Sequence, residues 1–367
     1  MSSDLNKYDK NMLSPVLEDS TYNYYNVKEA PFKMEGLAWF EKEKEFFRLP
    51  KGCKEKVSEA VYWLSSHPAG AQIRFRSDAN RISIKVKLNA PGNMTHMTAV
   101  GQTGFDLYYR DSNNPEYTFY SATNYPFGKD EYTVAIFNGD IKELRDFVIN
   151  FPLYMGVKEV LVGIEKGCCL LEPVARKDDK KIVVYGTSIT QGGCASRPGM
   201  AYTNILSRYF DQEFINLGFS GSGLGELEMA ELITEIDNVG MIVLDYEANG
   251  GCTGHLEKYM EQFIGILRNK YPLVPILVMT KPPFANYRFV SDEIKARNRV
   301  FNFQKNLVNK LKLKGDKNIY FYDGNKVYGK HDIYEMTVDG LHATDLGFYM
   351  MAKSLYPVFK RILNKKA

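Results

Sequence analysis

Hydrophobic positions alternate with polar ones through the first half of the chain. Residues 72–76 and 81–88 show this period of two clearly, because Ile and Phe or Val positions are separated by Arg, Lys or Ser. Successive side chains of a strand point to opposite faces, so this alternation predicts half-buried β-strands. The polar link at 77–80 predicts that the two runs form a hairpin. Further strands are predicted at 60–64, 105–110, 131–137, 147–150 and 159–164, and this spacing predicts an antiparallel β-sandwich.

Beyond residue 181, short apolar runs alternate with longer stretches of helical period. Strands are predicted at 182–185, 214–217, 241–246, 276–280 and 319–322. Helices are predicted at 201–210, 227–236, 256–269, 292–313 and 345–363. Regular alternation of this kind predicts a mostly parallel sheet with helices on both faces. The charged connector near 177–181 marks the change, so we predict a β-sandwich domain over 1–176 and an α/β domain over 181–367.

Composition and charge narrow the functional classes. The 367 residues are 44% hydrophobic and 25% charged, which is typical of globular proteins. A net charge of +3 without a long basic block argues against nucleic acid as a partner. The first 20 residues lack the apolar core of a signal peptide, and no run approaches the ~18 apolar residues of a membrane span. The five cysteines show no metal-like spacing, so reduced thiols and a cytoplasmic location are expected, although a removed signal peptide would leave the same sequence.

Polar groups follow the predicted strands of the second half. Ligands of open α/β sheets bind outside the carboxyl ends of the strands, so these positions are the candidate site. Ser188 follows the first strand, a glycine-rich turn containing Gly221 follows the second, and Asn249 follows the third. The last loop carries Asp339 and His342, three residues apart.

This set of residues meets the needs of acyl transfer. A serine hydroxyl needs an adjacent base at neutral pH, which His342 can supply, and Asp339 can hold the imidazole in one tautomer. The oxyanion of a tetrahedral intermediate could accept hydrogen bonds from Ser188 N–H, Gly221 N–H and the Asn249 amide. The chain order Ser, Asp, His is that of α/β-hydrolases. However, the acid and the base share one loop here, and the serine follows the first strand of its domain, which indicates a different fold.

The second half resembles the SGNH-type (GDSL-like) hydrolases, which are marked by four blocks in order. The counterparts are Gly-Thr-Ser-Ile at 186–189, Gly-Phe-Ser-Gly at 218–221, Glu-Ala-Asn-Gly at 247–250 and Asp-Gly-Leu-His at 339–342. The resemblance implies a flavodoxin-like α/β/α domain with Ser188 as nucleophile, His342 as base and Asp339 as its orienting acid. It also implies an oxyanion hole from Ser188, Gly221 and Asn249. Two positions depart from the family pattern, since Thr187 and Gly250 stand where aspartate is usual.

The first half is similar to the jelly-roll-like β-sandwich that precedes this domain in part of the family. Its marker is Gly-x-Asp-Leu-Tyr, which 104–108 matches. Relatives with this architecture include carbohydrate deacetylases and some acyltransferases. Asp106, the acid of the marker, is expected to pin a loop through hydrogen bonds, with a place on the active-site rim as the alternative. The sandwich itself could be a rigid support or could supply part of the substrate rim.

The leading hypothesis is a serine esterase that removes a short acyl group, acetyl first, from a carbohydrate or similar alcohol, without a metal or cofactor. An acyltransferase with a hydroxyl acceptor is the second hypothesis. A non-catalytic carbohydrate-binding protein is the third, and it would use aromatic residues of the first half, namely Trp39, Trp63, Tyr108 and Tyr109. Tyr246, Glu247 and Lys281 lie at or near strand ends and are candidate pocket residues. A metal site at Cys252 and His255 is disfavoured because no second ligand pair accompanies them, and His67, His96 and His331 have no partner at a telling spacing. The sequence leaves the oligomeric state open.

Overall fold

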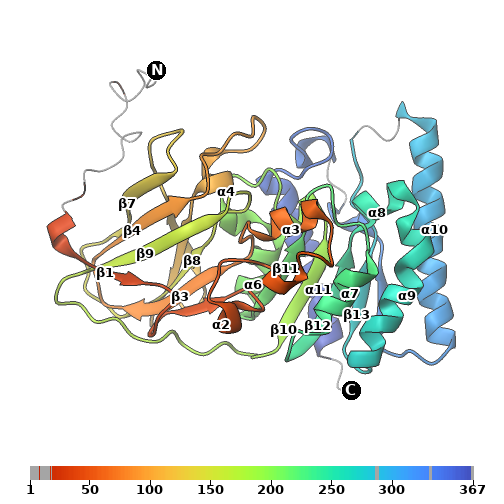
Figure 1. Ribbon diagram of the computed structural model, residues 1–367, viewed down its shortest axis with the longest axis horizontal. Helices are drawn as coiled ribbons and strands as arrows, with labels where there is room; N and C mark the ends of the chain where they lie inside the picture. The colour runs from red at the N-terminus through yellow and green to blue at the C-terminus, as the bar shows by residue number, and fades with distance from the viewer. Residues whose placement is uncertain (1–7, 9–16, 18, 286–288, 330–332, 365–367) are drawn as a thin grey trace.

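Two packed units make up the protein, an antiparallel β-sandwich at one end and an α/β/α unit at the other (Figure 1). The computed structural model describes residues 8, 17, 19–285, 289–329 and 333–364. His331 lies outside the described residues. The predicted combination of an antiparallel sandwich with a parallel α/β/α domain is confirmed. The exact limits 1–176 and 181–367 stay a prediction.

The sandwich consists of two antiparallel sheets facing one apolar core. One sheet has the order β1-β9-β4-β7, and the other has the order β2-β3-β8-β5-β6. The strands of the first sheet are β1 (Tyr22–Asn26), β9 (Val157–Glu165), β4 (Arg81–Leu88) and β7 (Glu131–Asn138). Those of the second are β2 (Lys33–Glu35), β3 (Gln72–Ser77), β8 (Arg145–Asn150), β5 (Asp106–Arg110) and β6 (Thr118–Ala122). The alternating positions Ile82, Ile84 and Val86 are buried against Ile73 and Phe75, which explains the period of two.

Two expectations about the sandwich are wrong. The runs at 72–76 and 81–88 do not form a hairpin, because β3 pairs with β2 and β8, whereas β4 pairs with β7 and β9. The link between them crosses from one sheet to the other, and Asp78 Oδ1 anchors it by accepting a hydrogen bond from Cys169 N at 2.8 Å. Each sheet thereby receives one apolar face for the shared core.

The segment at 60–64 is not a strand but part of helix α3 (Glu59–Ser65). Ser58 caps this helix, since its hydroxyl accepts a hydrogen bond from Val61 N. Val61 and Leu64, three residues apart, form the buried face, which is a helical rather than a strand spacing. Two further short helices interrupt the strands of this half, α2 (Phe40–Glu43) and α4 (Ala99–Thr103).

The α/β/α unit contains a parallel sheet of order β11-β10-β12-β13-β14. Its strands are β10 (Lys181–Gly186), β11 (Phe214–Gly218), β12 (Val239–Asp245), β13 (Ile276–Met279) and β14 (Ile319–Tyr322). Helices α7 (Leu227–Ile233), α9 (His255–Lys270) and α10 (Ser291–Leu313) cover one face, and α6 (Tyr202–Phe210) and α11 (Asp345–Leu363) cover the other. The strand order reverses between β10 and β12, which is where ligands bind in flavodoxin-like sheets.

Residues between β2 and β3 join the two units. Trp39, Leu49 and Leu64 are buried in the same core as Leu217 and Phe219 of the α/β/α unit. The first half of the chain therefore packs directly on the sheet that carries the candidate site. None of the helices in the described ranges is long and apolar enough to cross a membrane.

Candidate active site

Ser188 lies at the turn where β10 gives way to a short helix, α5 (Ser188–Gln191). Thr187 is extended and its hydroxyl accepts a hydrogen bond from Ile189 N at 3.4 Å, so it caps the helix. The serine is 6% exposed and lies at the carboxyl end of β10, beside the reversal of strand order. The fold therefore presents the candidate nucleophile at the sheet edge where the sequence analysis expects a site.

The final loop brings an acid and an imidazole to this serine. His342 Nε2 is 2.9 Å from Ser188 Oγ, and His342 Nδ1 is 2.7 Å from Asp339 Oδ2. The second carboxylate oxygen, Asp339 Oδ1, accepts hydrogen bonds from His342 N at 2.8 Å and Leu341 N at 3.0 Å. Gly340 has φ +87°, a conformation that favours glycine, and this turn places Asp339 and His342 side by side.

The charges in this group favour one protonation pattern. Partial burial raises the pKa of Asp339, but the hydrogen bonds from the His342 ring and from two backbone N–H groups outweigh it, so the net pKa lies below the usual range. The carboxylate is thus ionised and accepts the proton on His342 Nδ1. The lone pair of His342 Nε2 consequently faces the hydroxyl of Ser188, which can donate to it.

Two further segments carry the remaining candidate oxyanion donors, Gly221 and Asn249. Gly221 follows β11 with φ +67°, and Asn249 lies on α8 (Glu247–Thr253), a helix directly after β12 that the sequence analysis missed. Asn249 Nδ2 donates to Phe219 O at 3.4 Å, and Ser220 N donates to Gln191 Oε1 at 3.0 Å. These hydrogen bonds connect the glycine-rich loop to the asparagine on one side and, on the other, to α5, called the nucleophile helix below because it begins with the candidate nucleophile Ser188.

Of the three candidate pocket residues, two line a cavity of about 400 Å³ next to the site. Glu247 and Lys281 line it together with Ala248, the neighbour of Asn249, and Leu341, the neighbour of His342. Glu247 is nearly buried and accepts hydrogen bonds from Lys281 N at 3.1 Å and Gln304 Nε2 at 2.6 Å. Burial raises its pKa despite the nearby positive charges of Lys281 and Arg297.

The structure does not bring Tyr246 to this cavity, so that prediction is corrected. The side chain is 1% exposed and its ring packs 5.3 Å from Tyr185 and 5.8 Å from Phe263, centroid to centroid. Tyr246 therefore belongs to the core on the α7–α9 face of the sheet. Its place at the end of a strand did not reveal which face the side chain occupies.

Asp106 of the Gly-x-Asp-Leu-Tyr marker ties the sandwich to the loop behind the nucleophile. Its carboxylate is fully buried and accepts hydrogen bonds from Gly199 N at 2.7 Å, Arg197 Nη1 at 2.9 Å and Asn150 Nδ2 at 2.7 Å. Arg197 also donates to the Tyr108 hydroxyl. The interpretation of Asp106 as a residue that pins a loop is the one its contacts fit, and the pinned loop belongs to the other unit.

Several supporting residues gave no motif signal in the sequence. Gln191 Nε2 donates to Leu153 O at 2.9 Å, and the Tyr154 hydroxyl lies 3.4 Å from Ser188 O, so the sandwich contacts the nucleophile helix. Arg48, fully buried, donates to Leu64 O at 2.8 Å and to the carbonyl of Gly218 in the glycine-rich loop. Burial lowers its pKa to about 9. Only the folded chain brings these positions together.

Asp245 is a buried carboxyl group that is hydrogen-bonded to the nucleophile helix α5. It lies at the end of β12 and accepts hydrogen bonds at 2.8 Å from Thr190 Oγ1 of α5 and from the Tyr202 hydroxyl. Burial raises the pKa of Asp245 to about 7, and the two hydrogen bonds oppose this only in part.

A serine, an imidazole and a carboxylate aligned at the carboxyl edge of a flavodoxin-like sheet are the arrangement expected of a hydrolase of the α/β/α class. Comparison with family models agrees, because residues 179–360 match the GDSL-like Lipase/Acylhydrolase family and residues 22–170 match the GxDLY N-terminus of SGNH hydrolase-type esterases. The chain belongs to this family and is an ester hydrolase. Of the four aromatic residues that the non-catalytic alternative would use, Trp39 and Tyr108 are buried, Tyr109 is half-buried and Trp63 is 61% exposed, so they do not form one open sugar-binding surface.

Solved structures share the whole two-unit architecture. A protein of Bacteroides ovatus described as a GDSL-like lipase is 30% identical, with a TM-score of 0.85 over 94% of this chain and 99% of that chain. The salicylyl-acyltransferase SsfX3 of a tetracycline biosynthetic pathway is 15% identical, with a TM-score of 0.78 over 95% and 99%. The acetyl xylan esterase Est2A of Butyrivibrio proteoclasticus is 12% identical, with a TM-score of 0.59 over 94% and 99%. At these last two identities the likeness concerns the fold alone. A search of curated proteins found no match.

Proposed function

We propose that this protein is a serine esterase that removes a short acyl group, acetyl first, from a carbohydrate or similar small alcohol. The observation that carries the proposal is the aligned pair of hydrogen bonds, Ser188 Oγ to His342 Nε2 at 2.9 Å and His342 Nδ1 to Asp339 Oδ2 at 2.7 Å. Such an alignment activates a serine without a metal ion.

The proposed reaction has two half-reactions. Ser188 Oγ attacks the ester carbonyl while His342 Nε2 takes the hydroxyl proton, and the imidazolium is stabilised by Asp339. His342 then gives this proton to the departing alcohol oxygen, which leaves an acyl-Ser188 ester. Water, deprotonated by His342, attacks that ester and releases the carboxylic acid and free Ser188.

We assign the oxyanion hole to Ser188 N–H, Gly221 N–H and the Asn249 side-chain amide. The tetrahedral oxygen carries a negative charge only during each acyl transfer, so donors held in place beforehand stabilise the transition state more than the substrate. Support comes from the hydrogen bonds that tie the glycine-rich loop to Gln191 and Asn249. These ties hold the loop against the nucleophile helix.

The substrate class is inferred from the cavity beside the triad and from the fold relatives. A volume of about 400 Å³ is in the range of small-ligand sites, and its wall contains charged as well as apolar groups. Such a wall suits a polar alcohol portion better than a long acyl chain. Est2A, which shares the fold, is named as an acetyl xylan esterase, in line with a sugar ester as substrate.

The test is the initial rate on p-nitrophenyl esters of increasing acyl length, for wild type, Ser188→Ala and the control Ser112→Ala on an exposed loop of the sandwich. We expect turnover of the acetate ester and little of the octanoate, loss of turnover in Ser188→Ala, and wild-type rates in the control. Labelling by a fluorophosphonate should be lost with Ser188. An active Ser188→Ala enzyme would refute the acyl-serine mechanism.

The same experiment addresses the acyltransferase alternative, because transfer to a hydroxyl acceptor would use the same acyl-enzyme. Labelling of Ser188 without hydrolysis of any ester would favour a transferase that excludes water from the acyl-enzyme. Absence of both labelling and turnover would contradict both enzymatic proposals.

A further inference from the structure

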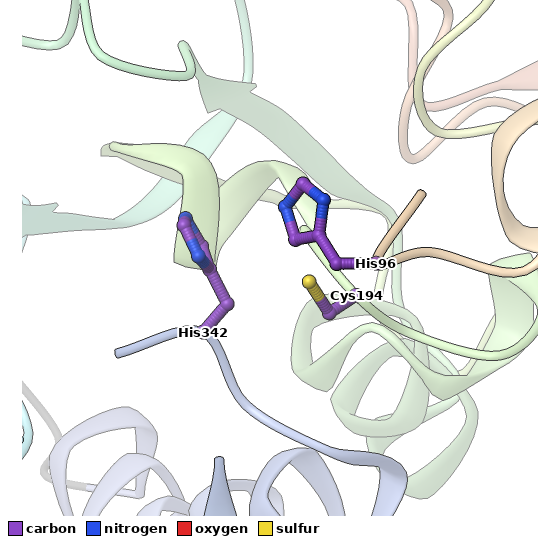
Figure 2. A group of neighbouring side chains, drawn as sticks. All are labelled: His96, Cys194 and His342. Carbon is purple, nitrogen blue, oxygen red and sulfur yellow. The ribbon is translucent and has the colours of Figure 1, made fainter. Parts of the chain in front are cut away.

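Two residues outside the triad, His96 and Cys194, converge on its histidine. Figure 2 shows their side chains pointing toward His342 from two different segments. His96 lies on the exposed sandwich segment between β4 and α4, and Cys194 lies just after the nucleophile helix α5. One ligand atom from each of the three side chains falls within 4.8 Å of the others, and the rings of His96 and His342 are 6.0 Å apart, centroid to centroid. Neither His96 nor Cys194 has a part in the proposed hydrolysis.

The ligand atoms of this cluster are of the kind that divalent transition metals of intermediate softness prefer. Two imidazole nitrogens and one thiolate sulfur suit Zn²⁺ or Co²⁺, whereas Mg²⁺ and Ca²⁺ require oxygen ligands. Metal–ligand distances of about 2.0–2.3 Å in a tetrahedral site place neighbouring ligand atoms about 3.5 Å apart. The cluster must therefore contract by about 1 Å, which the exposed side chain of His96 can supply by rotation.

We propose that His96, Cys194 and His342 form an inhibitory Zn²⁺ site that switches the ester hydrolase off. His342 Nδ1 donates its proton to Asp339, so the lone pair available to the metal is that of Nε2. The same lone pair accepts the hydrogen bond of Ser188 and would take its proton during catalysis. Zinc and the serine proton therefore compete for one lone pair, and the metal-bound enzyme has no base.

Binding involves no change of oxidation state. The S–H bond of Cys194 breaks, its proton passes to solvent, and a Zn–S bond forms, while the two histidines each contribute a neutral nitrogen. A water molecule completes the tetrahedron. The segments that carry the ligands come from both units of the protein, so an occupied site would also bridge the sandwich and the α/β/α unit, which is called the catalytic unit below.

The first test measures hydrolysis of p-nitrophenyl acetate against Zn²⁺ concentration in buffer free of chelators and thiols. We expect inhibition by Zn²⁺ that a chelator reverses, and no inhibition by Mg²⁺. His96→Asn and Cys194→Ser should each raise the half-inhibiting concentration about tenfold or more, because each removes one of three ligands. The matched control is His255→Asn, which removes a histidine three residues from Cys252. This variant should have the same half-inhibiting Zn²⁺ concentration as the wild type. Equal inhibition of all variants would overturn the proposal.

The second test does not depend on the proposed hydrolysis. Co²⁺ is added to Ser188→Ala protein, and a sulfur-to-cobalt charge-transfer band and the intense visible bands of tetrahedral cobalt are expected. Loss of the charge-transfer band in Ser188→Ala with Cys194→Ser, and weaker binding with His96→Asn, would support the assigned ligands. The exposed position of His96 keeps this test informative if replacement of the buried thiol impairs folding. Octahedral spectra without the sulfur band would refute the site even if the esterase proposal fails.

Discussion

Replacement of Asp106 by asparagine tests whether the buried carboxylate holds the two units together. Asp106 Oδ2 accepts from Arg197 Nη1 and Gly199 N, and Oδ1 accepts from Asn150 Nδ2. An asparagine keeps the volume but has one acceptor oxygen where the carboxylate has two. Either orientation of its amide sets an NH₂ group against at least one existing donor, and the positive charge of Arg197 loses its partner.

The expected loss of stability is large because all these groups are buried or nearly so. Removing one partner of a buried ion pair costs about 3–5 kcal/mol, since the other charge is left without compensation. Arg197 is 20% exposed and can recover some hydration, so we expect the lower part of this range, about 3 kcal/mol. The same replacement at an exposed aspartate should instead change the unfolding free energy by less than about 0.5 kcal/mol.

The measurement is urea unfolding followed by tryptophan fluorescence, with Asp140→Asn as the control. Asp140 is an exposed aspartate on a loop of the same sandwich, so the chemical change is identical. We expect a lower midpoint for Asp106→Asn and an unchanged midpoint for the control. If both variants unfold like the wild type, the carboxylate does not clamp the units and the reasoning from burial is wrong.

Two further predictions concern the catalytic unit. Asn249→Ala should lower kcat on p-nitrophenyl acetate by a factor of about 10²–10³ with little change in KM, because an oxyanion donor acts mainly in the transition state. An unchanged kcat would show that Asn249 is not an oxyanion donor. Burial raises the folded-state pKa of Asp245 from 3.8 to about 7, so the folded state binds the proton more tightly than the unfolded state does. The unfolding free energy should therefore fall as the pH rises from about 4 through 7, by about 4 kcal/mol in all. Asp245→Asn lacks this loss, so the difference between variant and wild-type unfolding free energies should grow over that pH range; a difference independent of pH would contradict the assignment.

The parallel sheet, the five predicted helices on its faces and the positions of the candidate triad could be predicted from local patterns. Apolar runs such as 182–185 and 276–280 are buried on both faces, so they read as strands without reference to the rest of the chain. Ser188, Asn249, Asp339 and His342 follow strand ends or the last loop, and a sheet of this type collects such positions at one edge. Their actual distances, however, depend on the turn at Gly340.

The strand pairing and the contacts around the site depend on which distant segments pack together, and the local sequence pattern does not indicate this. The run at 72–76 alternates as a hairpin strand would, yet its partners are β2 and β8, because burying two apolar faces against each other decides the pairing. His96 has no neighbour in sequence that points to a site, and it reaches His342 only because the sandwich packs on the catalytic unit. Tyr246 and Glu247 are adjacent after β12, where α8 begins, but the turn into this helix places the first side chain in the core and the second in the cavity wall. Side-chain chemistry and the periodicity of hydrophobic positions determine the helices and strands, while the packing of these elements determines which side chains share a site.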